Sequence, residues 1–266
     1  MDERPIGIFD SGFGGLTVVR ALLDLLPHEQ LVYLGDTGRY PYGPRPADEV
    51  RRFAIELTAT LVERHDVKMV VVACNTAASA ALEELRARFR VPVLGVIEPG
   101  LRAAVQATRN AQVGVIGTVG TIASGSYQHL AEAMRAPVDL HCAACPGFVE
   151  FVERGELDTD QVHVLAERLL APLRERDVDT LLLGCTHYPY LARTIADVMG
   201  REVVLVSSAE ETAFDVRSVL AATGIGRPPG EPPLHRFYSS GDVGHFAEMG
   251  GRLLGREIGV AEPFVC

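Results

Sequence analysis

Two cysteines end two similar apolar segments of this 266-residue chain. Cys74 follows Met-Val-Val-Val-Ala at 69–73, and Cys185 follows Thr-Leu-Leu-Leu-Gly at 180–184. A short aliphatic run that stops at a small residue is typical of a buried parallel strand, and open α/β sheets bind ligands at the carboxyl ends of such strands. Thiols on opposite sides of one carbon could remove its proton from one face and replace it from the other. The pattern indicates proton-transfer chemistry.

Polar side chains accompany both cysteines. His187 lies two residues after Cys185, where a protonated imidazole would favour the thiolate. Asp10 and Ser11 end an apolar segment and precede a glycine-rich turn. Asp10 could assist proton transfer at Cys74, or either residue could simply cap the helix that follows. The glycines there do not have the spacing of a dinucleotide-binding fingerprint.

The segment 35–44 contains too much glycine, proline and tyrosine to form a strand or a helix. We expect an ordered rim over the site. Backbone N–H groups near Gly43 could bind a carboxylate, or the segment could be only a rigid surface turn.

Matched segments indicate that the chain contains two similar halves. The segment 113–118 matches 6–11 in pattern, and 92–96 and 202–206 follow the two cysteine segments at nearly the same separation. We predict an α/β fold with two similar parallel-sheet lobes related by pseudo-two-fold symmetry and the active site in the cleft between them. Residues 1–98, completed by 210–266, would form the first lobe, and 99–209 the second.

The coarse hydrophobic pattern places strands and helices in alternation. Strands are expected near 5–9, 31–34, 69–73, 92–96, 112–116, 138–141, 180–184, 202–206 and 235–239, and helices at 47–64, 77–89, 100–108, 124–134, 161–176 and 209–223.

Composition excludes several classes of protein. A formal charge of −10 argues against binding to nucleic-acid phosphates, and no apolar stretch is long enough to span a membrane. The first residues do not resemble a signal peptide, so a cytoplasmic location with reduced thiols is expected. Lys68 is the only lysine and begins the first cysteine strand, away from the expected site. Schiff-base chemistry with pyridoxal phosphate and a P-loop are therefore not expected.

Cys142-Ala-Ala-Cys145 has the spacing of some metal and redox motifs. A zinc site needs about four ligands and no second pair of this kind exists in the chain. We interpret these cysteines, and Cys266, as structural, and no metal is expected.

Several ordered motifs together resemble those of bacterial glutamate racemases, of the aspartate/glutamate racemase family, over essentially the whole chain. They are Ile8-Phe9-Asp10-Ser11 with the glycines after it, Gly35-Asp36-Thr37, Tyr40-Pro41-Tyr42-Gly43, Ala73-Cys74-Asn75-Thr76-Ala77, Gly184-Cys185-Thr186-His187-Tyr188-Pro189, the segment from Cys145-Pro146 to Gly155, and Ser240-Gly241-Asp242. The least typical feature is the segment from Gly147 to Val149.

The resemblance implies interconversion of L- and D-glutamate without a cofactor, for peptidoglycan synthesis. It implies that Cys74 removes the α-proton of the D-enantiomer and Cys185 that of the L-enantiomer. Asp10 and His187 would assist and touch the substrate, and Glu153 would be a weaker catalytic neighbour. The remaining implied substrate contacts are Ser11, Asn75, Thr76 and Thr186 for the α-carboxylate and ammonium, and the backbone of Tyr42 and Gly43 with Thr118 or Thr121 for the side-chain carboxylate.

Alternatives remain open at this point. An aspartate or hydantoin racemase would keep both thiols and change the side-chain pocket. A redox or metal protein would depend on Cys142 and Cys145 instead. A non-catalytic regulatory role towards DNA gyrase, which some glutamate racemases have, would need neither catalytic thiol. The partners expected are therefore glutamate and a second copy in a homodimer, with gyrase by resemblance only and no direct contact with nucleic acid or a membrane.

Overall fold

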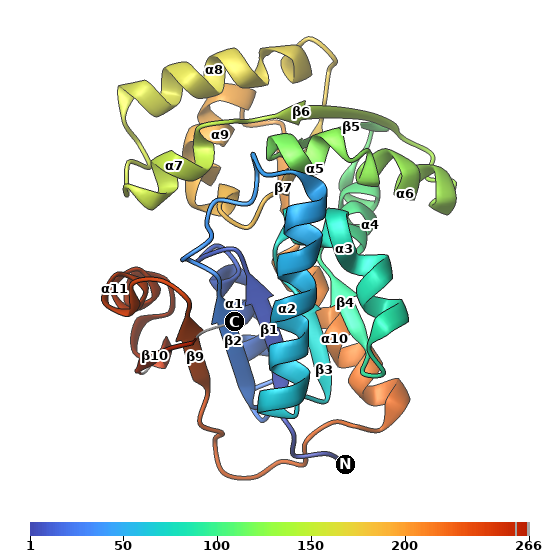
Figure 1. The fold of residues 1–266 in the computed structure, drawn as a ribbon. Coiled ribbons are helices and arrows are strands. Elements are labelled where there is room, and N and C mark those ends of the chain that lie inside the picture. The colour runs from blue at the N-terminus through green and yellow to red at the C-terminus, as the bar shows by residue number, and fades with distance from the viewer. Residues whose placement is uncertain (259, 265–266) are drawn as a thin grey trace. The chain divides into compact units, whose positions relative to one another are not determined.

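The computed structural model describes residues 1–258 and 260–264, and Cys266 lies outside them. The chain forms two compact units. The first combines Met1–Val96 with the described residues from Ala209 onward, and the second is Ile97–Ser208. Figure 1 shows strands alternating with helices along the chain. None of the helices within the described residues is long and apolar enough to cross a membrane.

The first unit is built on a parallel sheet with the strand order β10-β9-β2-β1-β3-β4. The strands are β1 (Ile6–Asp10), β2 (Leu31–Gly35), β3 (Met69–Val72), β4 (Val93–Gly95), β9 (Arg236–Ser239) and β10 (Ala261–Pro263). The helices are α1 (Leu16–Leu25), α2 (Ala47–His65), α3 (Asn75–Arg88), α10 (Ala209–Thr223), α11 (Val243–Leu254) and the 3₁₀ helix η2 (Gly255–Ile258). The C-terminal strands β9 and β10 thus extend the sheet beside β2 (Figure 1).

Successive side chains of β1 lie on opposite faces of this sheet. Ile6 and Ile8 belong to the apolar core shared with α1, α10 and α11. A Cβ atom added to Gly7 would lie 2.9 to 3.1 Å from side-chain atoms of Val67 and Leu61, so α2 packs closely on the opposite face. Both faces are covered, which explains why all five residues of β1 are buried.

The second unit is built on a parallel sheet with the strand order β6-β5-β7-β8. The strands are β5 (Gln112–Gly117), β6 (Asp139–Ala144), β7 (Thr180–Gly184) and β8 (Val204–Ser207). The helices are α4 (Ile97–Ala107), α5 (Val119–Ala123), α6 (Ser126–Met134), α7 (Phe148–Glu153), α8 (Asp160–Arg174), the 3₁₀ helix η1 (Tyr188–Leu191) and α9 (Ala192–Met199).

The predicted duplication is confirmed by the strand orders. In the first unit β1 lies between β2 and β3, with β4 beyond β3; in the second, β5 lies between β6 and β7, with β8 beyond β7. The strands that match in sequence therefore occupy matching places, and the two cysteines follow β3 and β7, which correspond to each other.

The structure corrects several predicted elements. The helix predicted at 124–134 begins at Ser126, because Gly125 has a φ of +66° and separates it from the short helix α5, which was not predicted. The helix predicted to begin at residue 77 begins at Asn75, directly after Cys74, and the helix predicted from 100 begins at Ile97. The strand predicted at 138–141 continues to Ala144. The short strand β10 was not predicted.

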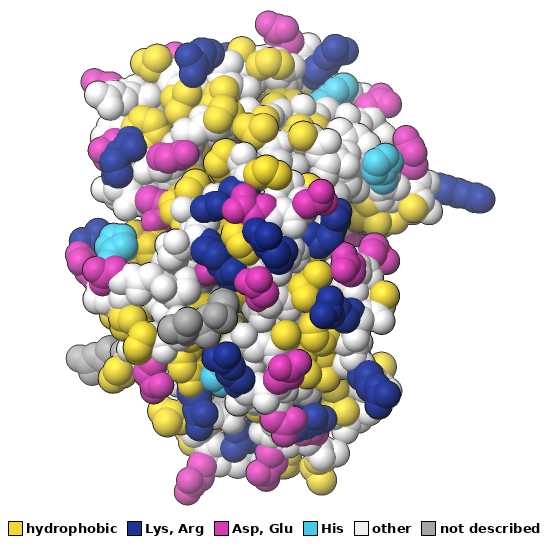
Figure 2. Space-filling model, in the orientation of Figure 1, with side chains coloured by type: hydrophobic (Ala, Val, Ile, Leu, Met, Phe, Trp, Pro, Cys, Tyr) yellow, Lys and Arg dark blue, Asp and Glu magenta, His cyan; other side chains and the backbone are white. Residues whose placement is uncertain are grey.

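Lys68 is almost fully buried at the start of β3, where its Nζ lies 2.6 Å from the Glu29 carboxylate and 2.9 Å from the carbonyl oxygen of Asp2. It therefore holds the amino-terminal segment against the sheet. On the face drawn in Figure 2, Asp and Glu side chains are interspersed among the basic residues.

Candidate functional site

The cysteine after β3 is the amino-terminal cap of α3. The Cys74 side chain is 5% exposed, and its Sγ accepts a hydrogen bond from the Ala77 backbone N–H at 3.4 Å. The amino terminus of a helix carries partial positive charge, which stabilises an anion such as a thiolate. Asn75 and Thr76 form the first turn of α3 and are also buried. The strand-to-helix turn therefore provides an environment suited to a thiolate at Cys74.

Ser11 lies between the Cys74 thiol and the Asp10 carboxylate. The Cys74 Sγ donates to the Ser11 Oγ at 3.8 Å, and the Ser11 hydroxyl donates to Oδ1 of Asp10 at 3.0 Å. The Ser11 backbone N–H also donates to Asp10 Oδ1. The side chain of Asp10, at the end of β1, is fully buried. The thiol and the carboxylate are thus linked through a hydroxyl, a detail that the sequence prediction for Asp10 did not contain.

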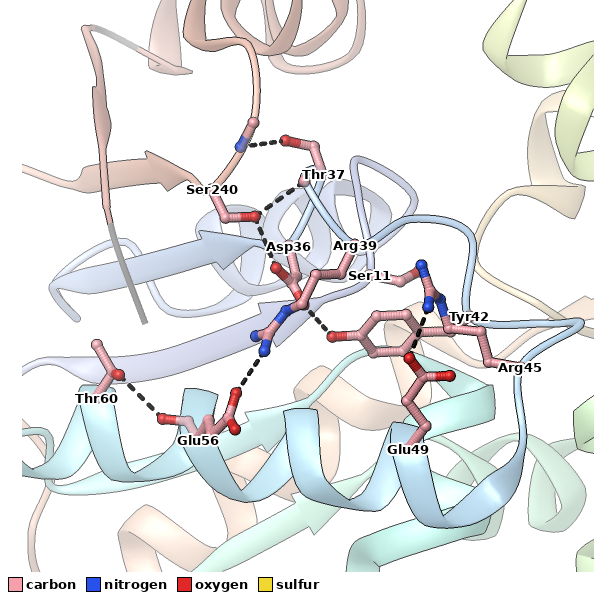
Figure 3. A network of polar contacts seen from close by, with 12 residues as sticks. Ser11, Asp36, Thr37, Arg39, Tyr42, Arg45, Glu49, Glu56, Thr60 and Ser240 are labelled. Atoms are coloured by element: carbon pink, nitrogen blue, oxygen red, sulfur yellow. Dashed lines mark hydrogen bonds and ion pairs between the residues drawn. The ribbon is translucent and has the colours of Figure 1, made fainter.

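The rim segment 35–44, with Arg45 after it, is held by a polar network in the same unit (Figure 3). The hydroxyl of Tyr42 and the Nε of Arg39 both donate to Oδ2 of Asp36. Arg39 also pairs with Glu56 of α2, and Arg45 pairs with Glu49 of α2 at 2.8 Å. Burial and the neighbouring Asp36 carboxylate raise the pKa of Tyr42 far above its ordinary value, so its hydroxyl stays protonated.

Gly43 follows Tyr42 within this segment, so the backbone that was predicted to bind a carboxylate belongs to an anchored loop. The Arg45 backbone N–H donates to the Tyr42 carbonyl oxygen at 3.0 Å, and the Arg45 Nε donates to the Pro41 carbonyl oxygen at 3.2 Å. The segment is firmly held, and a negative charge on Cys74 would add to the raised pKa of Tyr42. Binding of a carboxylate by the backbone of this segment stays a prediction.

The second unit carries the other thiol with a histidine and a carboxylate. The Cys185 Sγ lies 3.9 Å from Nδ1 of His187, and Nε2 of His187 lies 2.7 Å from Oε1 of Glu153. Burial by itself lowers the pKa of His187, but the hydrogen bonds and negative charges of Cys185 and Glu153 raise it to about 10. The imidazole is therefore positively charged at neutral pH, and it lies between the Cys185 sulfur and the Glu153 carboxylate.

The packing of α7 places Glu153 beside His187. Gly147, with a φ of +95°, lets the chain turn into α7 directly after the end of β6. Phe148 then packs edge-on against Tyr188 at 5.4 Å between ring centroids, and the Tyr188 hydroxyl donates to the carbonyl oxygen of Cys145 at 3.1 Å. The segment from Cys145 to Phe148 thus packs against Tyr188, close in sequence to Cys185 and His187.

Three threonines complete the polar surroundings in the second unit. Gly117 of β5 pairs with Gly184 of β7, so Thr118 and Cys185 follow neighbouring positions at the carboxyl ends of adjacent strands. The Thr118 Oγ1 caps α5 by accepting from the Thr121 backbone N–H at 3.2 Å. Thr121 is fully buried, and Thr186, which follows Cys185, is 6% exposed.

The surroundings of Cys142 and Cys145 do not favour a reactive thiol pair. Both are free thiols, and burial raises their pKa values to about 11 and about 12. A reactive thiol pair requires the opposite shift. Within residues 1–258 and 260–264, no group of three or more His, Cys, Asp or Glu side chains is placed to hold a metal ion.

The structure therefore gathers the predicted residues into two clusters, one in each unit. The Cys74 cluster comprises Asp10, Ser11, Cys74, Asn75 and Thr76, with Tyr42 and Gly43 in the rim, and the Cys185 cluster comprises Thr118, Thr121, Glu153, Cys185, Thr186 and His187. Sequence reasoning assigned no role to Asp36 and Ser240 of the rim network. The sequence indicated them only as members of the motifs Gly35-Asp36-Thr37 and Ser240-Gly241-Asp242.

The chain matches the family model Asp/Glu/Hydantoin racemase over residues 14–213. It is 54% identical to a glutamate racemase of Acidothermus cellulolyticus over 97% of this chain and 98% of that protein. It resembles the crystal structure of the glutamate racemase isoform RacE1 of Bacillus anthracis, with a TM-score of 0.94, 41% identity and coverage of 100% of this chain and 98% of the other. For a Francisella tularensis glutamate racemase in complex with D-glutamate, the TM-score is 0.92, the identity 30%, and the coverage again 100% and 98%. The chain therefore belongs to the Asp/Glu/hydantoin racemase family and, within it, to the glutamate racemases.

Proposed function

We propose that this protein interconverts L- and D-glutamate by a two-thiol mechanism that needs no cofactor. Membership of the glutamate racemases supports the reaction. The observation that carries the mechanism is the pair of buried thiols, each just beyond the carboxyl end of the corresponding strand of two similar sheets and each beside its own polar partners. The D-glutamate in the Francisella tularensis structure supports glutamate as the substrate.

In the proposed reaction, the thiolate of one cysteine takes the α-proton of glutamate and becomes a thiol. The thiol of the other cysteine donates its proton to the opposite face of the same carbon and becomes a thiolate. Cys74 acts as the base on D-glutamate and Cys185 as the base on L-glutamate. After one turnover each cysteine holds the protonation state that the reverse reaction needs, so the proton count is balanced.

The two thiols are supported by different groups. At Cys74, the amino terminus of α3 stabilises the thiolate, and Ser11 connects the thiol to the Asp10 carboxylate. At Cys185, the His187 imidazolium stabilises the thiolate by its charge, and Glu153 maintains that charge. Asp10 and His187 are accordingly proposed as assisting groups at the two ends of the proton transfer.

The other residues of the two clusters are proposed as substrate contacts. Ser11, Asn75, Thr76 and Thr186 would bind the α-carboxylate and ammonium, and the backbone at Tyr42 and Gly43, with Thr118 or Thr121, would bind the side-chain carboxylate. The product D-glutamate would supply peptidoglycan synthesis. A cytoplasmic location and a homodimer remain predictions from the sequence, and an interaction with DNA gyrase remains a prediction of the resemblance only.

Proton exchange in D₂O tests the proposal. Purified protein without added cofactor is incubated with D-glutamate or L-glutamate under reducing conditions, while NMR follows the α-proton signal and polarimetry follows the optical rotation. We expect the α-proton signal to disappear with both enantiomers as the rotation decays to zero. Cys74→Ser and Cys185→Ser should each abolish racemisation in both directions, because every turnover uses both thiols, whereas Cys142→Ser, the matched control, should retain activity.

Three results would contradict parts of this proposal. Folded wild-type protein that exchanges aspartate but not glutamate would place it among aspartate racemases. Racemisation by the Cys74→Ser/Cys185→Ser double variant would refute the two-thiol mechanism. Loss of activity on removal of a metal by a chelator would refute the absence of a cofactor.

A further inference from the structure

The Ser240-Gly241-Asp242 motif near the carboxyl terminus lies against the rim segment, far from it in sequence. Ser240 directly follows β9, and its backbone N–H donates to the Gly35 carbonyl oxygen at 3.1 Å. Asp242 is the amino-terminal cap of α11, where its Oδ1 accepts from the His245 backbone N–H at 2.9 Å. The aspartate therefore has a structural role, which leaves the serine and the glycine to be explained.

The Ser240 hydroxyl fixes the orientation of the Asp36 carboxylate. It accepts a hydrogen bond from the Gly38 backbone N–H at 2.9 Å and donates to Oδ1 of Asp36 at 2.7 Å (Figure 3). Because the Gly38 N–H points at the oxygen, the hydroxyl proton is left for the carboxylate. Ser240 thus occupies one carboxylate oxygen, and Tyr42 and Arg39 occupy the other.

Three donors meet the two oxygens of one fully buried carboxylate. An ionised carboxylate accepts hydrogen bonds only, and its rotation is set by the donors on both oxygens. Loss of the donor on Oδ1 leaves that oxygen buried with an unsatisfied acceptor, which favours a rotated or displaced carboxylate. Tyr42, whose hydroxyl binds Oδ2, would then shift together with the neighbouring backbone of the rim.

Close backbone approach explains the glycine. The Gly241 backbone N–H donates to the Thr37 Oγ1 at 3.0 Å, and that same oxygen lies 2.6 Å from the Ser239 hydroxyl oxygen. A Cβ atom at Gly241 would lie 2.7 Å from the Thr37 Oγ1 and 3.0 Å from the Gly38 backbone nitrogen. Any larger residue at 241 would therefore push the segment from Asp36 to Gly38 away from β9.

We propose that Ser240 is a positioning residue for substrate binding: the turn Ser239–Gly241 clamps the segment from Asp36 to Gly38 and, through the Asp36 carboxylate, fixes the Tyr42–Gly43 rim. This inference rests on the proposed function, because the rim is the proposed binding site for the side-chain carboxylate of glutamate. Ser240 does not touch the reacting atoms, so its removal affects substrate binding and leaves the proton transfer at the thiols in place.

The test compares Ser240→Ala with wild type in steady-state racemisation of both glutamate enantiomers. We expect KM to rise about tenfold for each enantiomer, the lower end of the effect of losing a hydrogen bond to a charged group, with a smaller change in kcat. Ser240→Thr, which keeps a hydroxyl, should restore KM. The matched control is Ser218→Ala, which removes an exposed hydroxyl that donates to the Phe214 carbonyl oxygen on α10.

A second pair of variants tests the clamp without removing a hydroxyl. Gly241→Ala should raise KM in the same way, because its Cβ displaces Thr37, whereas Gly251→Ala on α11 adds a Cβ with no atom within 4 Å. Ser240→Ala and Gly241→Ala that match their controls in KM would overturn the positioning role. A lower kcat with unchanged KM, or a loss of folded protein with normal kinetics in the remainder, would also overturn it. An inactive wild type would overturn the proposed function, and the positioning role with it. An active wild type whose KM is unaffected by both substitutions would overturn the positioning role alone.

Discussion

Removal of the negative charge of Glu153 should lower both the pKa of His187 and the free energy of unfolding. The perturbation is Glu153→Gln, which keeps the size and one hydrogen-bonding oxygen of the side chain but removes its charge. Since His187 Nε2 lies 2.7 Å from the Glu153 carboxylate, we expect the substitution to destabilise the charged imidazole relative to the neutral one. The matched control is Glu150→Gln, the same change at an exposed position in the first turn of the same helix.

The size of the effect follows from the pKa of His187, which is about 10 in the folded protein against an ordinary value of 6.5. A nearby opposite charge shifts a pKa by roughly 1 to 3 units, and each unit corresponds to about 1.36 kcal/mol. Glu153→Gln should therefore lower the pKa of His187 by about 1 to 3 units. The free energy of unfolding should fall by about 1.4 to 4 kcal/mol where the imidazole is charged.

The pH dependence has a definite sign. A pKa raised in the folded state means that the stabilisation is fully present below pH 6.5 and is lost as the pH rises through about 10. The stability difference between wild type and Glu153→Gln should consequently be largest near pH 6 and should shrink towards pH 10. The difference between wild type and Glu150→Gln should stay small throughout.

Two measurements check this reasoning. NMR titration of ¹⁵N-labelled histidine gives the pKa of His187 in each variant, and urea unfolding at several pH values gives the free energies. A His187 pKa that is unchanged in Glu153→Gln, or a stability difference that does not vary between pH 6 and pH 10, would refute the argument that Glu153 maintains the imidazolium.

Two further predictions concern the first unit. Lys68→Met should lower the free energy of unfolding by about 3 to 5 kcal/mol, because it leaves the Glu29 carboxylate buried without its cation; urea unfolding measures this, and KM for glutamate should not change. Ser11→Ala should lower kcat about 100-fold or more, the lower range for losing a positioned proton-transfer group, because it breaks the link from Cys74 to the carboxylate behind it. A kcat within twofold of wild type in Ser11→Ala would mean that this link does not take part.

The features that could be predicted from the sequence are those set by local patterning. Aliphatic runs identified the strands before Cys74 and Cys185, and the order of matched runs predicted two similar sheets, as the strand orders confirm. The helix boundaries were less accurate because backbone conformation at single residues decides them. Gly125, in the left-handed region, delays the start of α6 to Ser126, and the thiol of Cys74 acts as a cap although cysteine is not a common capping residue.

Contacts between distant segments could not be predicted in this way. Ser240 and Asp36 are 204 residues apart in the chain, and Glu153 and His187 are 34 apart. The hydrophobic periodicity of the sequence does not predict such a pair, because the two partners lie in different segments and come into contact only in the folded protein. The sequence placed Tyr42 and Gly43 in an ordered loop, but the carboxylate that anchors the loop and the serine that orients this carboxylate required the structure. The catalytic roles of the clustered residues remain predictions.

The unlike surroundings of the two thiols constrain how the proposed racemase divides its rate between directions. L- and D-glutamate have equal free energies in solution, so the equilibrium constant is one and kcat/KM must be equal for the two enantiomers. Cys74 has a helix terminus and a hydroxyl-linked carboxylate beside it, whereas Cys185 has an imidazolium. This difference therefore cannot make kcat/KM larger in one direction than in the other. Their difference is confined to kcat and KM taken separately. A substitution beside one thiol must lower kcat/KM equally for both enantiomers, even where it alters the kcat of one direction more than that of the other.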